Sequence, residues 1–231
     1  MNGVLRLVES VPEAFAELVA ATVAAAAPDG CSLFLSGGGT AVECYAALAA
    51  RTALPWSSVD VFLGDERCVP PDDPDSNHRM IVRTLLDVVG PVRTDHPMYT
   101  SGTPDDAAAA YQALVAALPR PDVVHLGLGP DGHTASLFPG SVALADTDPS
   151  HLVVADTDPT GRNPHPRITL TLGGIARAAR VVFTVAGTSK REALARIHAG
   201  ADLPGGRVTA DDVVWLVDAD ALGDLVPDEV G

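Results

Sequence analysis

The sequence has few aromatic residues and little positive charge. Phe, Trp and Tyr make up 4% of the 231 residues, so the core must be built mainly from Ala, Val and Leu. The formal net charge is −15 at pH 7, and no basic stripe offsets it. A field of that sign repels nucleic acid and anionic lipid, so we expect neither as a partner. To bind an anionic small molecule against this field, the protein would need a local group of backbone amides and cationic side chains at the binding site.

Cysteines are few, and the sequence contains no long apolar run. Cys31, Cys44 and Cys68 lack the spacing of a metal site, and we expect them to be small core residues. An odd number of thiols suits a reducing compartment better than a disulfide framework. No run approaches the roughly 18 apolar residues that span a bilayer, and the first fifteen residues lack the pattern of a secretory leader. We therefore expect a cytoplasmic protein with no membrane partner.

Short apolar runs alternate with helical segments along the chain. The predicted strands are Gly3–Val8 at a sheet edge, Cys31–Ser36, Val59–Leu63, Asp122–Leu128, His151–Ala155, Arg167–Leu172, Arg180–Ala186 and Asp212–Asp218. The predicted helices are Val11–Ala27 with a stop at Pro28–Gly30, Ala41–Arg51, one capped by Ser76 or Asn77 and running to Val89, Thr103–Leu118, and one within Gly187–Gly200.

The order of these elements indicates a fold class. Nearly continuous apolar strands are typical of a sheet whose two faces are both covered by helices. The β-α-β-α order predicts an α/β fold: a doubly wound, mostly parallel, Rossmann-like sheet with helices on both faces. Because we find no internal repeat and no low-complexity linker, we expect residues 1–231 to form a single domain.

Four polar segments directly follow predicted strands. They are Ser36–Thr40, Gly64–Arg67, Gly129–His133 and Gly187–Lys190. Ligands of open α/β sheets bind beyond the carboxyl ends of the strands, so we expect these segments to converge on one site.

The first of these segments contains three consecutive glycines. Gly37, Gly38 and Gly39 allow a tight turn that aims several N–H groups at one point. Thr40 would then cap the next helix, whose N-terminus favours an anion. No Lys follows the last glycine, as a Walker A loop requires, and Val42 stands where G-x-G-x-x-G needs glycine. The alternative is a plain strand-to-helix turn.

The second segment places three charges at a strand end. Arg67 could hold an anion or a developing oxyanion, while Asp65 and Glu66 could bind sugar hydroxyls or orient Arg67. A solvated strand end would also explain this composition.

The third segment formally contains a dinucleotide fingerprint. Gly127, Gly129 and Gly132 spell G-x-G-x-x-G. However, Pro130 has no N–H to offer a pyrophosphate, and Asp131 would place a carboxylate beside it. The motif also lies in the middle of the chain, so we reject a dinucleotide site.

The same segment carries a candidate acid–base pair. His133 suits proton transfer near neutral pH, and Asp131 could orient it or stabilise its protonated form; a capping motif is the alternative. Ser136 lacks the G-x-S-x-G pattern of a serine hydrolase. A metal site could form from His125, Asp131 and His133, but His125 lies inside a strand, so we favour a core histidine there.

The last segment supplies a candidate phosphate contact. Lys190 together with helix-end amides could bind a phosphate, although a capped helix with a solvated lysine has the same sequence. Arg167 is our candidate for a second cation that contacts the phosphate, and Arg162 is the alternative.

Taken together, the segments resemble the 6-phosphogluconolactonase family along nearly the whole chain. The matching stretches are LSGGGT, GDERCVP with DSN, LGLGPDGHTASLFPG and VAGTSKREAL. The resemblance implies a cofactor-free and metal-free enzyme of the oxidative pentose phosphate pathway. Its partner would be a small phosphorylated sugar lactone, 6-phospho-D-glucono-1,5-lactone, hydrolysed to 6-phospho-D-gluconate. We also expect a monomer.

The resemblance also implies roles for individual residues. His133 corresponds to the general base that activates water, and Asp131 and Asp65 to acidic positions of the site. The implied phosphate-binding elements are Gly37–Thr40, Arg167 and Lys190, and the implied further substrate contact is Arg67.

One departure separates the chain from a related group. In glucosamine-6-phosphate deaminase/isomerase, a Glu follows the DGH-type motif by five positions, where this chain has Phe138. Ring-opening isomerisation needs that extra acid or base, whereas lactone hydrolysis does not. The open alternatives are such an isomerase, a non-catalytic sugar-phosphate sensor and, least favoured, a dehydrogenase.

Overall fold

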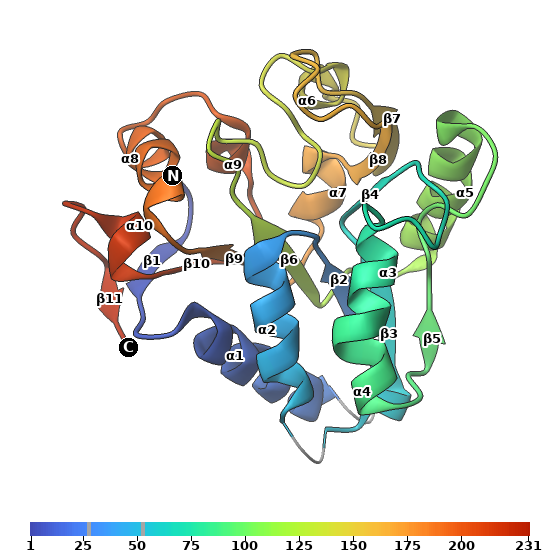
Figure 1. The fold of residues 1–231 in the computed structure, drawn as a ribbon, viewed down its shortest axis with the longest axis horizontal. Coiled ribbons are helices and arrows are strands. Elements are labelled where there is room, and N and C mark those ends of the chain that lie inside the picture. The colour runs from blue at the N-terminus through green and yellow to red at the C-terminus, as the bar shows by residue number, and fades with distance from the viewer. Residues whose placement is uncertain (27–28, 52–53) are drawn as a thin grey trace.

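A computed structural model describes residues 1–26, 29–51 and 54–231 (Figure 1). Within them, one eight-stranded sheet has the order β11 (Glu229–Val230), β1 (Val4–Leu7), β10 (Asp212–Val217), β9 (Arg180–Val185), β6 (Val123–Gly127), β2 (Cys31–Leu35), β3 (Val59–Leu63) and β5 (Thr94–Asp95). All pairings recorded in this sheet are parallel. The sheet confirms the predicted fold class, but β1 is not its edge, because β11 pairs outside it.

Helices surround this sheet (Figure 1). Their bounds are α1 Val11–Ala26, α2 Gly39–Ala49, α3 Asn77–Ile81, α4 Asp87–Val89, α5 Pro104–Ala117, α6 Val142–Ala145, α7 Leu172–Ala176, α8 Arg191–His198, α9 Pro204–Arg207 and α10 Ala219–Leu222. Short turns of other helical types are η1 Trp56–Ser58, η2 Val82–Leu86 and η3 Thr188–Lys190. The π-helical η2 joins α3 to α4.

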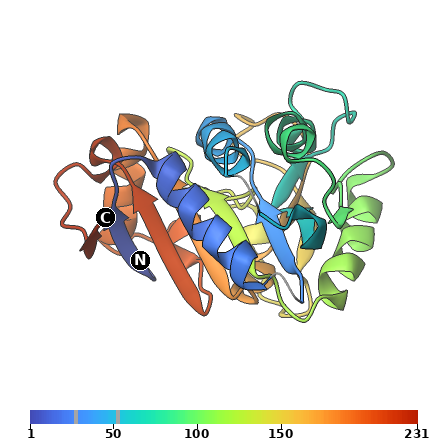
Figure 2. The same ribbon diagram turned by 90° about the horizontal axis from the view of Figure 1, so that it is seen from below.

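The hydrophobic core lies between the helices and the sheet. α1 packs against α2 and contacts β2, β9 and β10, and Figure 2 shows it lying across one face of the sheet. Phe15, Val19 and Val23 lie four residues apart, so they form one buried stripe on α1. The predicted end of this helix at Pro28 lies outside the described residues. Most buried side chains are Leu, Val and Ala, as the low aromatic content predicts.

A second, smaller sheet was not predicted. It is antiparallel, with the order β4 (Asp65–Arg67), β8 (Arg167–Leu170) and β7 (Val153–Asp156), and α5 packs on β7 and β8. The sequence predicted β7 and β8 as strands, but β4 consists of three charged residues and was read as a loop. This sheet brings Arg167 beside Arg67, far away in the sequence.

The strand order of the main sheet reverses between β2 and β6. From β2 the sheet continues through β3 to β5, whereas β6, β9 and β10 lie on the other side. Such a reversal leaves a crevice at the carboxyl ends of the strands, where ligands bind in open α/β sheets. Here the triple-glycine turn follows β2, and the loop with Asp131 and His133 follows β6.

Candidate active site

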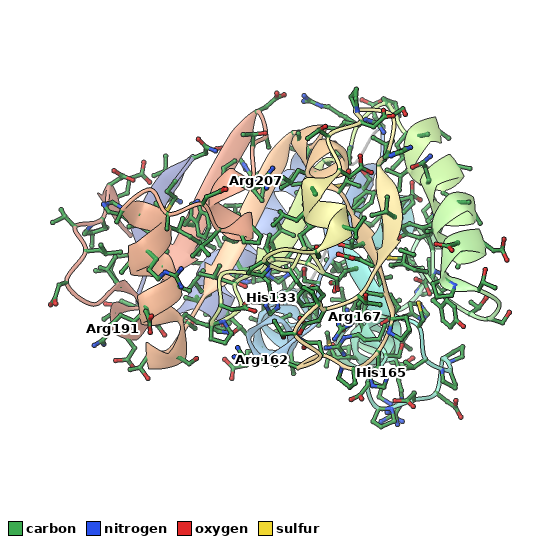
Figure 3. All side chains as sticks on the ribbon, turned by 90° about the horizontal axis from the view of Figure 1, so that it is seen from above. His133, Arg162, His165, Arg167, Arg191 and Arg207 are labelled. Carbon is green, nitrogen blue, oxygen red and sulfur yellow. The ribbon has the colours of Figure 1, made fainter. Side chains whose placement is uncertain are left out.

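A cavity of about 200 Å³ lies at this reversal point. Its lining includes the predicted residues Gly37, Gly38, Gly39, Thr40, Asp65, Arg67, His133, Arg167 and Lys190. Asp131 reaches the cavity through its contact with His133. All four polar segments therefore contribute to one site, and Figure 3 shows His133 and Arg167 in the middle of the molecule.

The triple-glycine turn leads directly into α2. Gly38 has a φ of 107° and precedes the first helical residue, Gly39. Thr40 therefore lies inside the first turn, and the prediction that it caps the helix is wrong. The first amides of a helix have no acceptor within it, and Gly39, Thr40 and Ala41 all line the cavity. These amides and the helix dipole favour an anion at this end.

Gly37 has no room for a side chain. A Cβ there would lie 1.9 Å from Oδ1 of Asn77, whose amide group is buried and donates to the Asp65 carbonyl at 2.9 Å. The absence of a side chain therefore allows the turn to pack against the start of α3.

We expect Gly37→Ala to lower the free energy of unfolding by about 1–3 kcal/mol, because the added methyl group must displace Asn77 or the turn. Gly39→Ala is the matched control, since nothing lies within 4 Å of its Cβ position. Urea unfolding of both variants measures the difference. Equal stability of the two variants would contradict the tight contact.

Glu66 anchors the start of α3. It is 1% exposed and accepts hydrogen bonds from the backbone amides of Asn77 and His78, each at 2.8 Å. Burial raises the pKa of Glu66, although its hydrogen bonds favour the charged form. Glu66 is not among the lining residues of the cavity, so our suggestion that it binds sugar hydroxyls is wrong. Its Oε1 also accepts a hydrogen bond from the Arg67 backbone amide at 2.7 Å, which agrees with the suggestion that it positions Arg67. Of the two predicted caps, Ser76 is the residue that accepts from a helix amide, that of Arg79 at 3.1 Å.

Asp65 joins the two sheets at the cavity. It lines the cavity, and its Oδ2 accepts a hydrogen bond from the buried Ser136 hydroxyl at 2.6 Å. Ser136 is 0% exposed and is not among the lining residues of the cavity, which does not favour a serine nucleophile.

Arg67 and Arg167 lie directly opposite each other on β4 and β8. Two like charges in this position are unfavourable. The Nε atoms of both are buried without a hydrogen-bond partner among the described residues, and burial lowers the pKa of Arg167. An anion in the cavity would relieve this repulsion. The competitor Arg162 is exposed, so Arg167 is the one placed at the cavity (Figure 3).

Lys190 is the single lysine of the sequence and lines the cavity from beyond β9. Burial lowers its pKa, and the negative charge of Asp131 opposes that shift. The Gly187 amide, which precedes the helical turn, donates to the Asp218 carboxylate at 2.9 Å, so this one amide is not free for a phosphate. Lys190 is the residue of this segment that lines the cavity.

The loop after β6 presents His133 to the cavity. His133 Nδ1 lies 2.6 Å from Oδ1 of Asp131, and its backbone amide donates to the same oxygen at 3.1 Å. Burial disfavours the charged carboxylate, but these contacts outweigh it and lower the pKa of Asp131. A carboxylate at Nδ1 favours the tautomer with the proton there, which makes Nε2 available as a base.

The glycines of this loop make room for the imidazole. A Cβ on Gly129 would lie 2.1 Å from Nδ1 of His133, and Gly132 has a φ of 89°. Described residues 128–141 contain no helix that could receive a pyrophosphate. These observations agree with our rejection of a dinucleotide fingerprint.

Some lining residues were not among the site residues that we predicted. They include Ala135, Asn163 and Thr184. Ala135 adopts a left-handed conformation with a φ of 46°, which is uncommon for a residue with a side chain. It lies in the segment that joins His133 to Ser136.

The remaining predictions concern histidine, cysteine and membrane spans. His125 is 0% exposed and hydrogen-bonded at both ring nitrogens, so the core interpretation is confirmed. Cys31 and Cys44 are buried, whereas Cys68 is only partly so, and all three are free. In the described part of the chain, no three His, Cys, Asp or Glu side chains group as metal ligands. Among the same residues, no helix is long and apolar enough to cross a membrane.

Residues 6–215 match the family model described as glucosamine-6-phosphate isomerases/6-phosphogluconolactonase. The chain belongs to this family. It is 41% identical to a 6-phosphogluconolactonase of Synechocystis over 211 residues, which cover 85% of each chain. It is 39% identical to one from Mycobacterium tuberculosis over 227 residues, covering 90% of this chain and 91% of the relative.

A solved structure of 6-phosphogluconolactonase from Thermotoga maritima has the same fold. Its TM-score with this protein is 0.82 at 30% identity, and the alignment covers 92% of this chain and 99% of the other. The family membership confirms the resemblance seen in the sequence. The family name covers two chemistries, an isomerase and a lactonase, so the residues of the site must discriminate between them.

Proposed function

We propose that this protein hydrolyses 6-phospho-D-glucono-1,5-lactone to 6-phospho-D-gluconate. The observation that carries the proposal is the shared cavity, in which a His–Asp pair, two arginines, a lysine and the start of α2 face one volume. A proton acceptor and an anion-binding surface side by side suit a phosphorylated ester. The relatives named 6-phosphogluconolactonase support the same substrate.

In this mechanism His133 acts as a general base. Nε2 takes a proton from water while the water oxygen bonds to the lactone carbonyl carbon, and the charge develops on the carbonyl oxygen. Asp131 holds the imidazole and stabilises its protonated form. As the intermediate collapses, the ring C–O bond breaks and His133 returns the proton to the departing oxygen. General base catalysis of this kind contributes about 10²–10⁴-fold.

Cationic side chains and backbone amides would bind the substrate at two places, its phosphate and its lactone carbonyl oxygen. The first amides of α2, Lys190 and Arg167 would hold the phosphate, which lies far from the reacting carbonyl. Binding energy from the phosphate positions the lactone ring. Arg67 is then available for the developing oxyanion, which preorganised donors stabilise.

Phe138 favours the lactonase over the isomerase. It is 1% exposed, and its ring centroid lies 5.0 Å from that of His133. The Arg167 guanidinium carbon lies 5.9 Å from the same ring. The position that carries an acid in the deaminase/isomerase therefore lies directly against the site, and phenylalanine there can neither give nor take a proton.

The activity is tested with freshly generated lactone in a pH-stat, corrected for spontaneous hydrolysis. We expect acid release well above the uncatalysed rate, no ammonia from glucosamine 6-phosphate and no tight binding of NAD(P). Catalysed ammonia release with no lactone hydrolysis would favour the isomerase, and phosphosugar binding without turnover of either substrate would favour a sensor.

We also propose that the enzyme works as a single-domain monomer in the cytoplasm. Among the described residues, exposed large hydrophobic side chains include Val88 on α4, Val142 on α6 and Val226 between α10 and β11. These segments lie on different sides of the molecule in Figure 1, which does not favour one large apolar patch. The three free thiols suit a reducing compartment. Light scattering of the purified protein would test the monomer.

A further inference from the structure

A buried hydrogen-bond network lies beneath the cavity and joins α2, β6, β9 and the turn after β2. Tyr45 Oη of α2 lies 2.8 Å from His125 Nδ1 of β6, and His125 Nε2 lies 2.8 Å from Thr184 Oγ1 of β9. Tyr45 Oη also accepts from the Ser36 amide at 2.7 Å and donates to the Ser36 carbonyl at 2.8 Å. All four residues are less than 5% exposed, and Ser36, His125 and Thr184 contribute to the cavity wall.

Only one arrangement of the protons in this network gives every donor and acceptor named above a hydrogen-bond partner. Burial lowers the pKa of His125 to about 3 and raises that of Tyr45, so the imidazole is neutral and the phenol keeps its proton. The Ser36 carbonyl receives the phenol proton. Tyr45 therefore has no proton left for His125, and Nδ1 of His125 must be the donor to Oη.

This arrangement determines which atom donates in the hydrogen bond between His125 and Thr184. With its proton on Nδ1, the neutral imidazole has a bare Nε2, which can only accept. Thr184 must donate its hydroxyl proton to Nε2 at 2.8 Å. The buried Cys44 thiol is a second hydrogen-bond partner of the Thr184 hydroxyl. Because Thr184 lines the cavity and its proton is committed to Nε2, the hydroxyl can accept a hydrogen bond there but cannot donate one.

We infer that Thr184 accepts a hydrogen bond from a ring hydroxyl of the substrate, and that buried His125 sets this polarity. The inference rests on the proposed lactone substrate and extends it to sugar recognition. Thr184 lies on β9, between the His133 loop after β6 and Lys190 after β9. It is placed to contact the middle of a molecule held at both ends, and a hydroxyl is the donor that a sugar ring offers there.

The test compares Thr184→Val with Thr184→Ser, which keeps the hydroxyl. Valine preserves the shape and suits a strand, and Thr22→Val on α1 controls for the loss of a hydroxyl remote from the cavity. We expect Thr184→Val to raise KM by about 3–10-fold with little change in kcat, because one neutral hydrogen bond is lost. Both Thr184→Ser and Thr22→Val should keep a KM close to that of the wild type.

Lactones lacking one ring hydroxyl separate a direct contact from a structural effect. For the analogue that lacks the contacted hydroxyl, the wild type and Thr184→Val should have equal KM values. If Thr184→Val leaves KM for the intact lactone unchanged, or raises it equally for every deoxy analogue, the contact does not exist. If the wild type fails to hydrolyse the intact lactone, the proposed function falls and this inference falls with it.

Discussion

Replacing His133 by alanine is expected to lower kcat on fresh lactone by about 10²–10⁴-fold. The change removes the one imidazole that the structure places beside a carboxylate in the cavity, and general base catalysis contributes an effect of this size. KM should change little, because the phosphate contacts remain. Initial rates at saturating lactone, corrected for spontaneous hydrolysis, measure the effect.

A second His–Asp pair provides the control. His151 Nδ1 lies 2.7 Å from Asp146 Oδ2, and neither residue lines the candidate active-site cavity. His151→Ala should therefore leave kcat at the wild-type value. A His133→Ala variant that is folded and retains near-normal kcat would remove His133 from the role of base.

Replacing Lys190 by methionine is expected to raise KM for the phosphorylated lactone by about 10–100-fold. A hydrogen bond to a charged group contributes about 1.5–3 kcal/mol, which corresponds to a change of that size. Methionine keeps much of the aliphatic stem, so the half-buried wall of the cavity is preserved. The value of kcat should change less than KM, since the phosphate lies far from the bond that breaks.

Two comparisons isolate the charge of Lys190. Arg191→Met removes the neighbouring positive charge, which is exposed and whose Nε donates to the Asp220 carbonyl. Its KM should stay close to that of the wild type. With unphosphorylated gluconolactone, Lys190→Met and the wild type should behave alike. An unchanged KM for the phosphorylated substrate in folded Lys190→Met would reject the phosphate role.

The sequence predicts the main sheet well because its strands are short, buried and apolar. Every residue of Cys31–Leu35 and Val59–Leu63 is buried, and each strand is apolar apart from its second residue, which is close to the pattern of a covered parallel strand. The strand Asp65–Arg67 has no such pattern, because its three charged residues are held by partners distant in the sequence. The two-residue strands at Thr94 and Glu229 are too short for any periodicity to show.

The residues of the candidate site, like the strands, could be predicted from the sequence only in part. Side chains at strand ends could be listed from the sequence, because the α/β topology gathers them at one edge. The role of Glu66 could not be read, since it depends on amides more than ten residues away. Thr184 looked like an ordinary residue of a buried strand, and only the hydrogen bonds of its neighbour His125 give its hydroxyl a direction.

The most direct test of this account is a crystal structure of the protein with 6-phosphogluconate bound. We predict the phosphate at the start of α2, within hydrogen-bond distance of Lys190, and carbon C1 about 3–4 Å from His133 Nε2. A ligand bound in the reverse direction, with its phosphate against His133, would contradict the account, as would a ligand bound outside the cavity.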